Sequence, residues 1–360
     1  MTPLQREQPR RILVRATNWV GDAVMTLPAV EALAQACPQA AIEVLAKPWV
    51  APVYAASPWV SAVKHYDASG AHAGLRGRLR LAGELKSIGY DWAVLFQNAF
   101  EAALIARLAG IPVRLGYATD GRSLLLTHKA ARTAQVRNIH ETSYYLHILW
   151  QAGLLDSEPP AGGVRPSLEL DSQDASWAQG FLAGEKIESG QPLLGLAPGA
   201  TFGPAKCWPA ERFVAAARDL AGEGTRAVLL FGSAAEKEAT DAVAQGLEGL
   251  KVVDLAGRTS LGQALALLAR LELFLTNDSG LMHAAAALGT PTVAVFGSTN
   301  PVTTAPLGPW VSIVRRPVDC SPCLKPVCPR DMRCFTAIEP QEVVRAGQEL
   351  LASKAREGQA

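Results

Sequence analysis

Short aliphatic runs alternate with longer amphipathic, alanine-rich stretches along the whole chain. In the first part, the runs that we predict to be strands are RILVRAT (11–17), AIEVLAK (41–47), DWAVLFQ (91–97) and IPVRLGY (111–117). Helical stretches separate them, such as the one that Pro38 ends. Because strands that alternate with helices usually run parallel, the pattern predicts a parallel sheet with helices on both faces.

The pattern breaks between about residues 151 and 192 and then starts again. The segment 157–173, SEPPAGGVRPSLELDSQ, is rich in Pro, Gly and Ser, which is typical of a linker between domains. Strand-like runs resume with PLLGLAPGA, RAVLLFGS, KVVDLAG, LELFLTN and TPTVAVFG. We therefore predict an α/β protein with Rossmann-like domains at 1–165 and 166–335 and a C-terminal helix within 336–360. Two such domains facing across a cleft suit a transferase that brings two substrates together.

Composition and charge narrow the class of protein. Of the 360 residues, 49% are hydrophobic and 19% are charged, which excludes a disordered chain. The net charge of +1 gives no electrostatic case for binding nucleic acid. No apolar run approaches the roughly 20 residues of a membrane span, and the run after the basic start, ILVRAT, is too short for the core of a signal peptide. We expect a cytoplasmic protein.

The segment 276–297, TNDSGLMHAAAALGTPTVAVFG, places a polar turn between two buried strands. Asp278 or Ser279 is expected to cap the helix that follows, and Gly280 lets a ligand approach the backbone. The first N–H groups of that helix, with His283 one turn in, would then form an anion site at the carboxyl end of a strand. The alternative is a well-capped helix that binds no ligand.

A second candidate loop, PGATFGPAKCW (198–208), also follows a strand. Lys206 offers a positive charge for a phosphate, although the loop lacks the spacing of a Walker motif. The alternative is an exposed loop lysine. No D-x-D motif for a divalent metal occurs in the chain, so a bound diphosphate would have to be neutralised by Lys206 and by helix N–H groups.

The first strand-to-helix turn, NWVGDAVMTLP (18–28), carries a carboxylate near the helix start. Asp22 is either a residue that the helix dipole stabilises or a general base that faces a substrate. These two interpretations stay open at the level of the sequence.

Four of the six cysteines cluster late in the chain with a C-x2-C-x4-C-x5-C spacing. Two interpretations are open for Cys320, Cys323, Cys328 and Cys334: thiolates that hold a structural zinc or iron ion, or reduced cysteines without a metal.

The stretch 114–137 contains five Lys or Arg residues against one Asp. It is interpreted either as a solvated face or as a basic surface for an anionic acceptor or an anionic membrane.

The chain resembles the lipopolysaccharide heptosyltransferases of glycosyltransferase family 9, most closely the heptosyltransferase II branch, in its motifs and in their order. The resemblance runs almost end to end and rests on NWVGDAVMTLP, PGATFGPAKCWP, FGSAAEKE, LAGRTSL, TNDSGLMHAAAALGTPTVAVFGSTNP and CSPCLKPVCP. It implies a GT-B architecture, with the acceptor in the N-terminal domain and ADP-L-glycero-β-D-manno-heptose in the C-terminal domain. The implied reaction inverts the anomeric centre and moves heptose to the inner core on lipid A.

The same resemblance implies roles for individual residues. Those that it assigns are the base Asp22, the diphosphate contacts Thr201 and Lys206, the nucleotide contact Glu236, and the donor-site turn of Asp278, Ser279, Gly280 and His283. Cys207 stands where relatives often have a basic residue, so the phosphate contact is expected to depend on Lys206. No cofactor is expected for catalysis, and the protein is expected at the cytoplasmic face of the inner membrane. Alternatives are another acceptor, such as a protein, and a non-catalytic sugar-nucleotide-binding protein.

Overall fold

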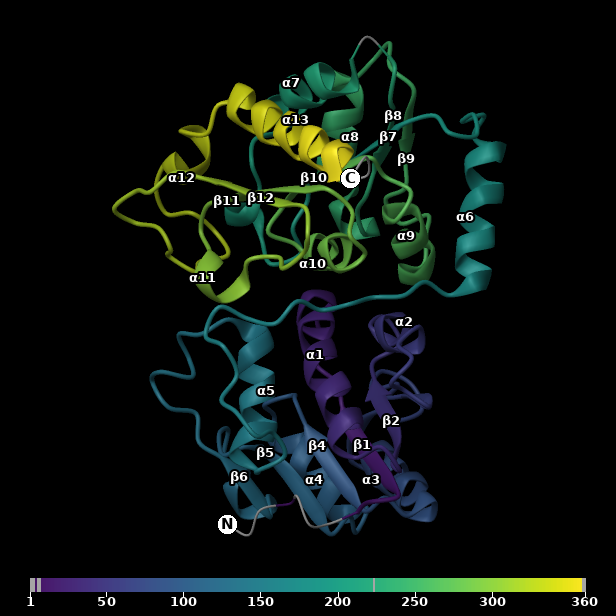
Figure 1. Cartoon of the computed structure of the whole chain (residues 1–360), viewed down its shortest axis with the longest axis vertical. Helices are drawn as coiled ribbons and strands as arrows, with labels where there is room; N and C mark the ends of the chain where they lie inside the picture. The colour runs from purple at the N-terminus through teal and green to yellow at the C-terminus, as the bar shows by residue number, and fades with distance from the viewer. Residues whose placement is uncertain (1–3, 5–7, 223, 358–360) are drawn as a thin grey trace. The chain divides into compact units, whose positions relative to one another are not determined.

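The computed structural model describes Leu4, residues 8–222 and residues 224–357. The chain divides into two compact units, Met1–Glu169 and Leu170–Ala360, which are described separately. Each unit contains one six-stranded sheet, and every strand pair in both sheets is parallel (Figure 1).

The sheet of the first unit has the strand order β3-β2-β1-β4-β5-β6. Its strands are β1 (Arg11–Arg15), β2 (Ala41–Ala46), β3 (Ala62–His65), β4 (Trp92–Leu95), β5 (Val113–Tyr117) and β6 (His128–Ala130). In the centre, Val14 pairs with Val44 on one side and with Val94 on the other, and all three side chains are fully buried. Burial on both faces is what continuous apolar runs predict for parallel strands.

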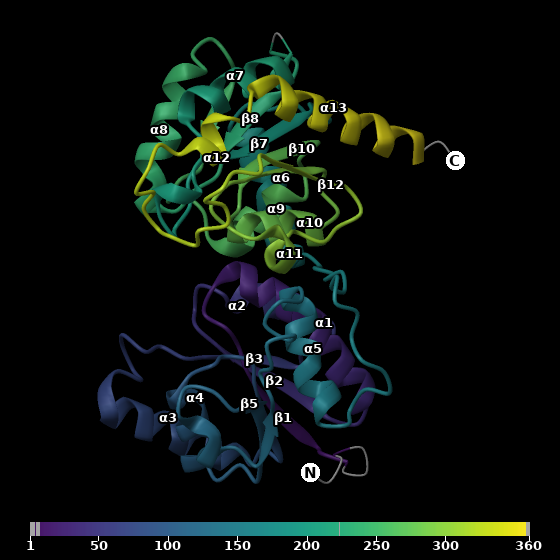
Figure 2. The same ribbon diagram turned by 90° about the vertical axis from the view of Figure 1, so that its left-hand side faces the viewer.

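Helices cover both faces of this sheet. They are α1 (Val20–Ala36), α2 (Ala51–Ala55), α3 (Gly74–Ile88), α4 (Phe100–Leu108), the 3-10 helix η2 (Arg122–Leu125) and α5 (Glu141–Gln151). Figure 2 shows α3 and α4 on one face and α1 with α5 on the other. Because α1 packs closely against α5 on the same face of the sheet, most of its residues are buried and its sequence is apolar on nearly every side.

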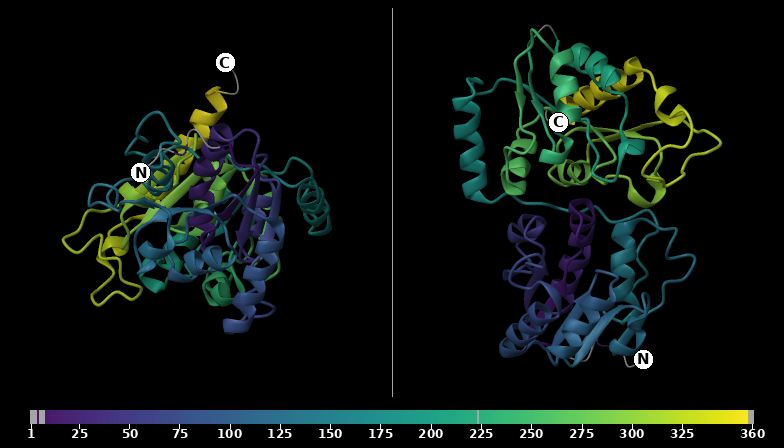
Figure 3. Two further views of the ribbon diagram at one scale, coloured as in Figure 1. Left: turned by 90° about the horizontal axis from the view of Figure 1, so that it is seen from below. Right: turned by 180° about the vertical axis from the view of Figure 1, so that it is seen from behind.

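The sheet of the second unit has the order β12-β11-β10-β7-β8-β9. Its strands are β7 (Leu193–Ala197), β8 (Ala227–Leu230), β9 (Val252–Asp254), β10 (Leu273–Asn277), β11 (Thr292–Phe296) and β12 (Val311–Arg315). Its helices are α6 (Ser172–Gly184), η3 (Pro204–Lys206), α7 (Ala210–Ala221), η4 (Ala234–Glu236), α8 (Lys237–Gly246), α9 (Leu261–Leu268), α10 (Gly280–Ala287), α11 (Pro301–Thr304), α12 (Arg333–Thr336) and α13 (Pro340–Glu357). The right-hand view of Figure 3 shows α6 beside α9 and α13 beside α7.

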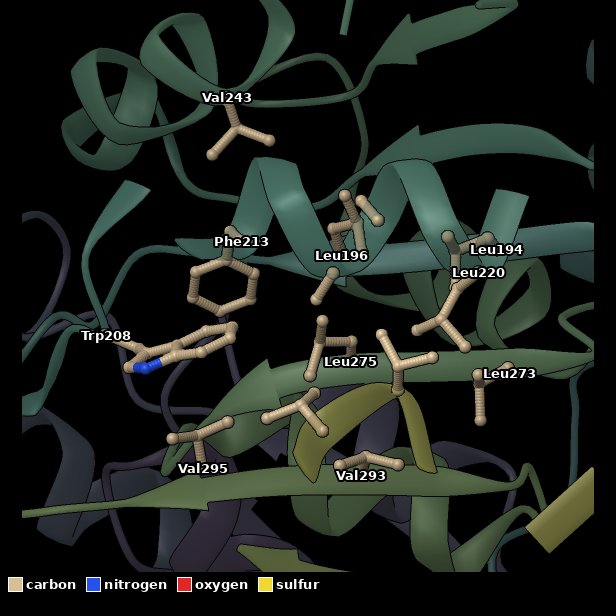
Figure 4. Close-up of a cluster of buried hydrophobic side chains, with 14 of the residues drawn as sticks. Leu194, Leu196, Trp208, Phe213, Leu220, Val243, Leu273, Leu275, Val293 and Val295 are labelled. Atoms are coloured by element: carbon tan, nitrogen blue, oxygen red, sulfur yellow. The ribbon is translucent and has the colours of Figure 1, made fainter. Parts of the chain in front are cut away.

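The core of the second unit lies between its sheet and helices α7 and α13 (Figure 4). The Trp208 and Phe213 rings pack edge to face, with centroids 5.2 Å apart, and both side chains are buried. A Cβ atom at Gly347 would lie 2.9 Å from the Leu273 side chain, so the glycine allows α13 to approach β10 closely. The C-terminal helix is therefore part of this core.

Counted from the first strand of each unit, both sheets have the order 3-2-1-4-5-6 of the dinucleotide-binding Rossmann fold. The direction of winding reverses between β1 and β4 in the first unit and between β7 and β10 in the second. Ligands of such sheets bind beyond the carboxyl ends of the strands at this reversal. The loops after β1 and β4 therefore mark a candidate site in the first unit, and those after β7 and β10 mark one in the second. In the part of the chain that the structure describes, no helix has the length and apolarity to cross a membrane.

Candidate active site

In the second unit, a charged contact spans the reversal point between β7 and β10. Lys206 ends η3 in the loop after β7, and Asp278 directly follows β10. The Lys206 Nζ atom donates a hydrogen bond to Asp278 Oδ2 at 2.8 Å, and both side chains are largely buried. The lysine and the polar turn predicted from separate motifs are thus brought together, although they are 72 residues apart in the sequence.

A buried amide fixes the loop after β7 against the end of β10. The Asn277 Oδ1 atom accepts a hydrogen bond from the Trp208 backbone N–H at 2.9 Å, and its Nδ2 donates to the Pro198 carbonyl at 2.6 Å. Asn277 thereby joins both ends of the loop that carries Lys206. Asn277 was not among the residues predicted to have a role, although an amide at the end of a buried strand is a signal for such a bridge.

Two adjacent residues of the polar turn, Asp278 and Ser279, have different interactions. Ser279 is the N-cap of α10, because its side chain accepts a hydrogen bond from the Met282 N–H at 3.3 Å. Asp278, the other cap candidate, pairs with Lys206 instead. Gly280 is the first residue of α10, and His283 is buried one turn later. The first N–H groups of α10 therefore begin next to the Lys206–Asp278 pair.

Glu236 is fixed at the carboxyl end of β8, where it ends η4. Its Oε2 atom accepts hydrogen bonds from the N–H and from the hydroxyl of Ser233, both at 2.8 Å. Its Oε1 atom accepts a longer one, 3.4 Å, from the Thr201 hydroxyl in the loop after β7. A Cβ atom at Gly199 would lie 2.8 Å from the Glu236 side chain, so only a glycine allows the loop to pass this close. The structure thus brings together Thr201 and Glu236 on the same sheet edge as Lys206.

In the first unit, Asp22 lies in the first turn of α1, after β1 and beside the reversal point. The N-cap of α1 is Trp19, which makes no side-chain capping bond. Asp22 is half-buried, three residues into the helix, where the helix dipole stabilises a negative charge. Its position is compatible with both interpretations of this residue, the dipole partner and the base.

A second carboxyl group near Asp22 was not found by the sequence analysis. Glu141 lies in the first turn of α5, the helix that packs against α1. Burial, and after it the negative charge of Asp22, raises the pKa of Glu141 to about 7, while Arg132 acts in the opposite direction. Burial and the same two carboxyl groups raise the pKa of Tyr145 well above its ordinary value. Because Asp22 and Glu141 are 119 residues apart, no local pattern signals this proximity.

The four late cysteines lie between β12 and the end of α12, and all are free thiols. Burial, and then the thiols of Cys320, Cys328 and Cys323, raises the pKa of Cys334, so the four groups lie in one neighbourhood. Among the described residues, however, no group of three or more His, Cys, Asp or Glu side chains is arranged to hold a metal ion.

The basic stretch 114–137 is only partly a surface. Arg122 is buried, and its guanidinium donates to the Tyr117 carbonyl at 2.9 Å and to Asn98 Oδ1 at 2.7 Å. Arg114 donates to the Leu125 carbonyl at 2.6 Å. Two of the five cations therefore stabilise the fold, and the exposed ones are Lys129, Arg132 and Arg137.

Comparison with known proteins agrees with this arrangement. Residues 78–332 match the family model described as glycosyltransferase family 9 (heptosyltransferase). Lipopolysaccharide heptosyltransferase 2 of Escherichia coli K12 is 32% identical over 316 residues, which cover 85% of this chain and 88% of that protein. Lipopolysaccharide heptosyltransferase 1 of Pseudomonas aeruginosa is 27% identical over 357 residues, which cover 92% and 96%.

A solved structure extends the similarity to three dimensions. The E. coli ADP-heptose lipopolysaccharide heptosyltransferase II structure has a TM-score of 0.79 and 30% identity, with 96% of this chain and 99% of that one covered. Two Rossmann-like domains with these sites define a glycosyltransferase of GT-B architecture, as the sequence predicted. The chain belongs to glycosyltransferase family 9, the heptosyltransferase family.

Proposed function

We propose that this enzyme transfers L-glycero-D-manno-heptose from ADP-heptose to the inner core of lipopolysaccharide, as a heptosyltransferase of type II. The observation that carries the proposal is the Lys206–Asp278 pair at the reversal point of the second sheet, within the segment that matches the family. The relative named heptosyltransferase 2 is 32% identical and the one named heptosyltransferase 1 is 27% identical, which favours type II.

The second unit is proposed to bind the donor. A lysine ammonium has three N–H donors, and Asp278 uses one, so two are left for the oxygens of the diphosphate. The N–H groups that follow Ser279 add further donors at the positive end of the α10 dipole. Thr201 is proposed to contact the diphosphate, and His283 is proposed to belong to the donor-site turn together with Ser279. Glu236 is proposed to accept hydrogen bonds from hydroxyl groups of the nucleotide.

The first unit is proposed to bind the acceptor, and Asp22 is proposed as the base. As the acceptor hydroxyl attacks the anomeric carbon, its proton passes to the Asp22 carboxylate and the bond to the diphosphate oxygen breaks. Attack opposite the leaving group inverts the anomeric centre, and positive charge develops on the sugar ring as in glycoside cleavage. Lys206 and the α10 N–H groups stabilise the charge that ADP takes with it.

The reaction is tested by mass spectrometry of the purified protein with ADP-heptose and a panel of truncated core oligosaccharides. The proposal predicts a product heavier by one heptose residue for at least one core, and release of ADP in equal amount. Heptose on a protein acceptor alone would support another member of the same family. ADP-heptose binding without transfer to any acceptor would support a non-catalytic binding protein.

We further propose that the first unit associates peripherally with the cytoplasmic face of the inner membrane. Residues 1–169 contain 17 Lys or Arg against 13 Asp or Glu, a net charge of +4, whereas the remaining 191 residues carry 17 against 20, a net charge of −3. On α3, Leu75 and Leu79 are exposed in one row beside the exposed Arg76 and Arg80. Exposed leucines beside cations suit a bilayer with anionic lipids.

The membrane proposal is tested by sedimentation with vesicles that contain or lack anionic lipid. The wild-type protein should sediment with anionic vesicles and less with neutral ones. The double variant Leu75→Gln, Leu79→Gln should lose this binding, whereas Val302→Gln, at an exposed valine of the second unit, should not. Equal binding of the leucine variant and the wild type would contradict the assignment of this surface.

In the proposed reaction, Lys206 and backbone N–H groups balance the leaving diphosphate, and no step uses a cofactor. A structural zinc or iron ion at the four late cysteines rests on their spacing alone, since the described side chains do not converge on a metal position. Elemental analysis of the purified protein tests it: one zinc or iron per chain, lost in Cys323→Ser, would establish the ion.

A further inference from the structure

A cation and two aromatic rings lie together at the carboxyl edge of the first sheet. Lys47 follows β2 directly, and its Nζ atom is 4.3 Å from the centroid of the Tyr66 ring and 5.6 Å from that of Trp49. Tyr66 follows β3. The Lys47 ammonium thus rests between two aromatic rings at the edge where parallel sheets bind their ligands.

The Trp49 ring is held in place although it is 55% exposed. Its indole N–H donates a hydrogen bond to the Asn18 carbonyl at 2.8 Å. Asn18 also accepts, through Oδ1, from the guanidinium of Arg15 at 3.3 Å. A large exposed apolar ring normally avoids water, so a fixed indole at a ligand-binding edge is a platform for the apolar face of a sugar.

The nearby positive charges have no carboxylate partner among the residues that the structure describes. No ion pair joins Lys47 or the buried Arg15 to an acidic side chain there. The Arg15 guanidinium is used by the Ala16 and Leu45 carbonyls and by Asn18, and lies 5.2 Å from the Tyr66 ring centroid.

The two carboxylates of this region are engaged elsewhere. Glu101 accepts from the Tyr66 hydroxyl and pairs with Arg78 at 2.6 Å. Asp67 accepts from the N–H groups of Gly70 and Ala71 at 2.9 and 3.0 Å.

Without a ligand, the positive charge of Lys47 costs free energy, because the side chain is partly desolvated and lies near the charge of Arg15. Burial lowers the pKa of Lys47 and the charge of Arg15 lowers it further, while the charges of Glu101 and Asp67 act in the opposite direction. Burial lowers the pKa of Arg15 itself to about 10. A partly desolvated cation gains most from an anion that enters the same site, because the interaction strengthens as water is excluded.

The location relates this cluster to the proposed base. Asn18, which holds the Trp49 ring, lies in the turn between β1 and α1, and Asp22 lies in the first turn of α1. A sugar on Trp49 therefore occupies the same strand-to-helix turn that presents Asp22. An acceptor of several sugar units can place its reacting hydroxyl at Asp22 and a neighbouring unit at this cluster.

We propose that Lys47 and Trp49, with Arg15 behind them, form a subsite for an anionic sugar of the acceptor, one that carries a carboxylate or a phosphate. The Lys47 ammonium binds the anionic group, and the Trp49 ring stacks on the sugar. The subsite rests on the proposed function, since it assumes that the first unit binds the acceptor, and it determines which acceptor is used rather than the chemistry at Asp22.

Steady-state kinetics of three variants test the subsite. Lys47→Met keeps most of the side-chain stem and removes the charge, so the acceptor KM should rise on the order of tenfold or more, with kcat and the KM for ADP-heptose nearly unchanged. Lys47→Arg should restore most of the affinity, which shows that the fold is intact. Lys354→Met, at an exposed lysine of α13 in the second unit, is the matched control and should behave as the wild type. An unchanged acceptor KM in Lys47→Met overturns the proposal.

Modified acceptors distinguish the two sources of negative charge. One preparation is treated with phosphatase, and another has its carboxyl groups converted to methyl esters. The treatment that removes the recognised group should weaken binding to the wild type and leave Lys47→Met unaffected. If both treatments weaken the wild type and Lys47→Met equally, Lys47 does not bind the anion and the proposal is wrong.

Calorimetric titration of the same acceptors into the ADP-loaded Asp22→Asn protein separates this inference from the proposed function. Binding that depends on Lys47, together with no heptose transfer by the wild-type protein, would support the subsite while the proposed reaction fails. Heptose transfer at the wild-type rate, with acceptor binding indifferent to Lys47 and Trp49→Ala, would leave the reaction intact and refute the subsite.

Discussion

The two units share one strand order and differ in the loop that follows their first strand. In the first unit, four residues separate β1 from α1, so the helix starts at the sheet edge and presents Asp22 from its first turn. In the second unit, twelve residues separate β7 from α7, and this loop folds over the end of β10 through Asn277. Loop length thus decides whether the edge presents a helix-borne carboxylate or a loop-borne lysine.

The two edges also differ in how their charges are compensated. Lys206 of the second unit is already paired with Asp278, so it is oriented before a ligand binds. Lys47 of the first unit contacts aromatic rings instead. The same fold thus holds one cation in place with a carboxylate and another with π-systems, which supports the proposal that the two edges bind different ligands.

The largest effect is expected where the short loop presents its carboxylate. Asp22→Asn should lower turnover by two or more orders of magnitude, because general base catalysis is worth about 10²–10⁴-fold. ADP binding, measured by calorimetry, should be nearly unchanged, since the shape of the side chain is kept. Glu31→Gln, later in the same helix, is the control. Turnover near the wild-type rate in Asp22→Asn would mean that Asp22 is not the base and only stabilises the start of the helix.

A smaller effect is expected at the long loop. Lys206→Ala should weaken ADP-heptose binding by about 10- to 150-fold, the worth of a hydrogen bond to a charged group, and should lower kcat as well, because charge grows on the departing ADP. The acceptor KM should change little. Combining Lys206→Ala with Asp278→Asn tests the pair itself, and the two effects should not add. If only the acceptor affinity suffers, the donor and acceptor have been assigned to the wrong units.

The free energy of unfolding of the protein should also depend on pH, because of the partly buried Glu141 in the first unit. The pKa of Glu141 is raised to about 7, so the unfolded chain loses this proton at a lower pH than the folded protein does. The wild-type protein therefore loses stability as the pH rises from the ordinary carboxyl pKa of 4.5 to about 7, and the loss levels off above that pH. Glu141→Gln should gain on the order of 2–3 kcal/mol relative to the wild type between pH 5 and pH 8. Urea denaturation at both pH values measures it, with the exposed Glu248→Gln as control. An equal stability difference at both pH values would contradict the raised pKa.

The smallest effect is expected on removing divalent metals. Heptose transfer should persist in EDTA, because Lys206 and the α10 N–H groups occupy the place of metal-binding carboxylates in the proposed reaction. The assay is transfer rate with and without chelator. A loss that added Mg²⁺ restores would refute this description of the donor edge, whereas a loss accompanied by unfolding would point to the late cysteines.

The sequence by itself determined the class of fold and the family. Strands such as LLGLA in β7 and LFLTN in β10 are buried on both faces, so they form continuous apolar runs that can be recognised in the sequence. The family motifs are local as well, since most of them begin at or just after the carboxyl end of a strand. The match over residues 78–332 and the heptosyltransferase II structure confirm both predictions.

Short or partly exposed elements escaped the sequence analysis. The edge strands β3 and β12 contain mainly half-buried or exposed residues, and β6 is three residues long, so none leaves a continuous apolar run. Helix α5 was also missed, although its buried face packs on α1. Edge strands pair with a neighbour on one side only and are less buried than central strands, which weakens their local signal.

Only the tertiary structure decided which polar groups meet. The Lys206–Asp278 pair, the Asn277 bridge, the approach of Glu141 to Asp22 and the aromatic setting of Lys47 each join loops from different strands. Arg122 shows most clearly what the sequence cannot predict. It lies in a basic stretch, but its buried guanidinium donates hydrogen bonds to three oxygens. Hydrophobic periodicity encodes which face of an element is buried, whereas the order of strands in the sheet determines which loop ends become neighbours.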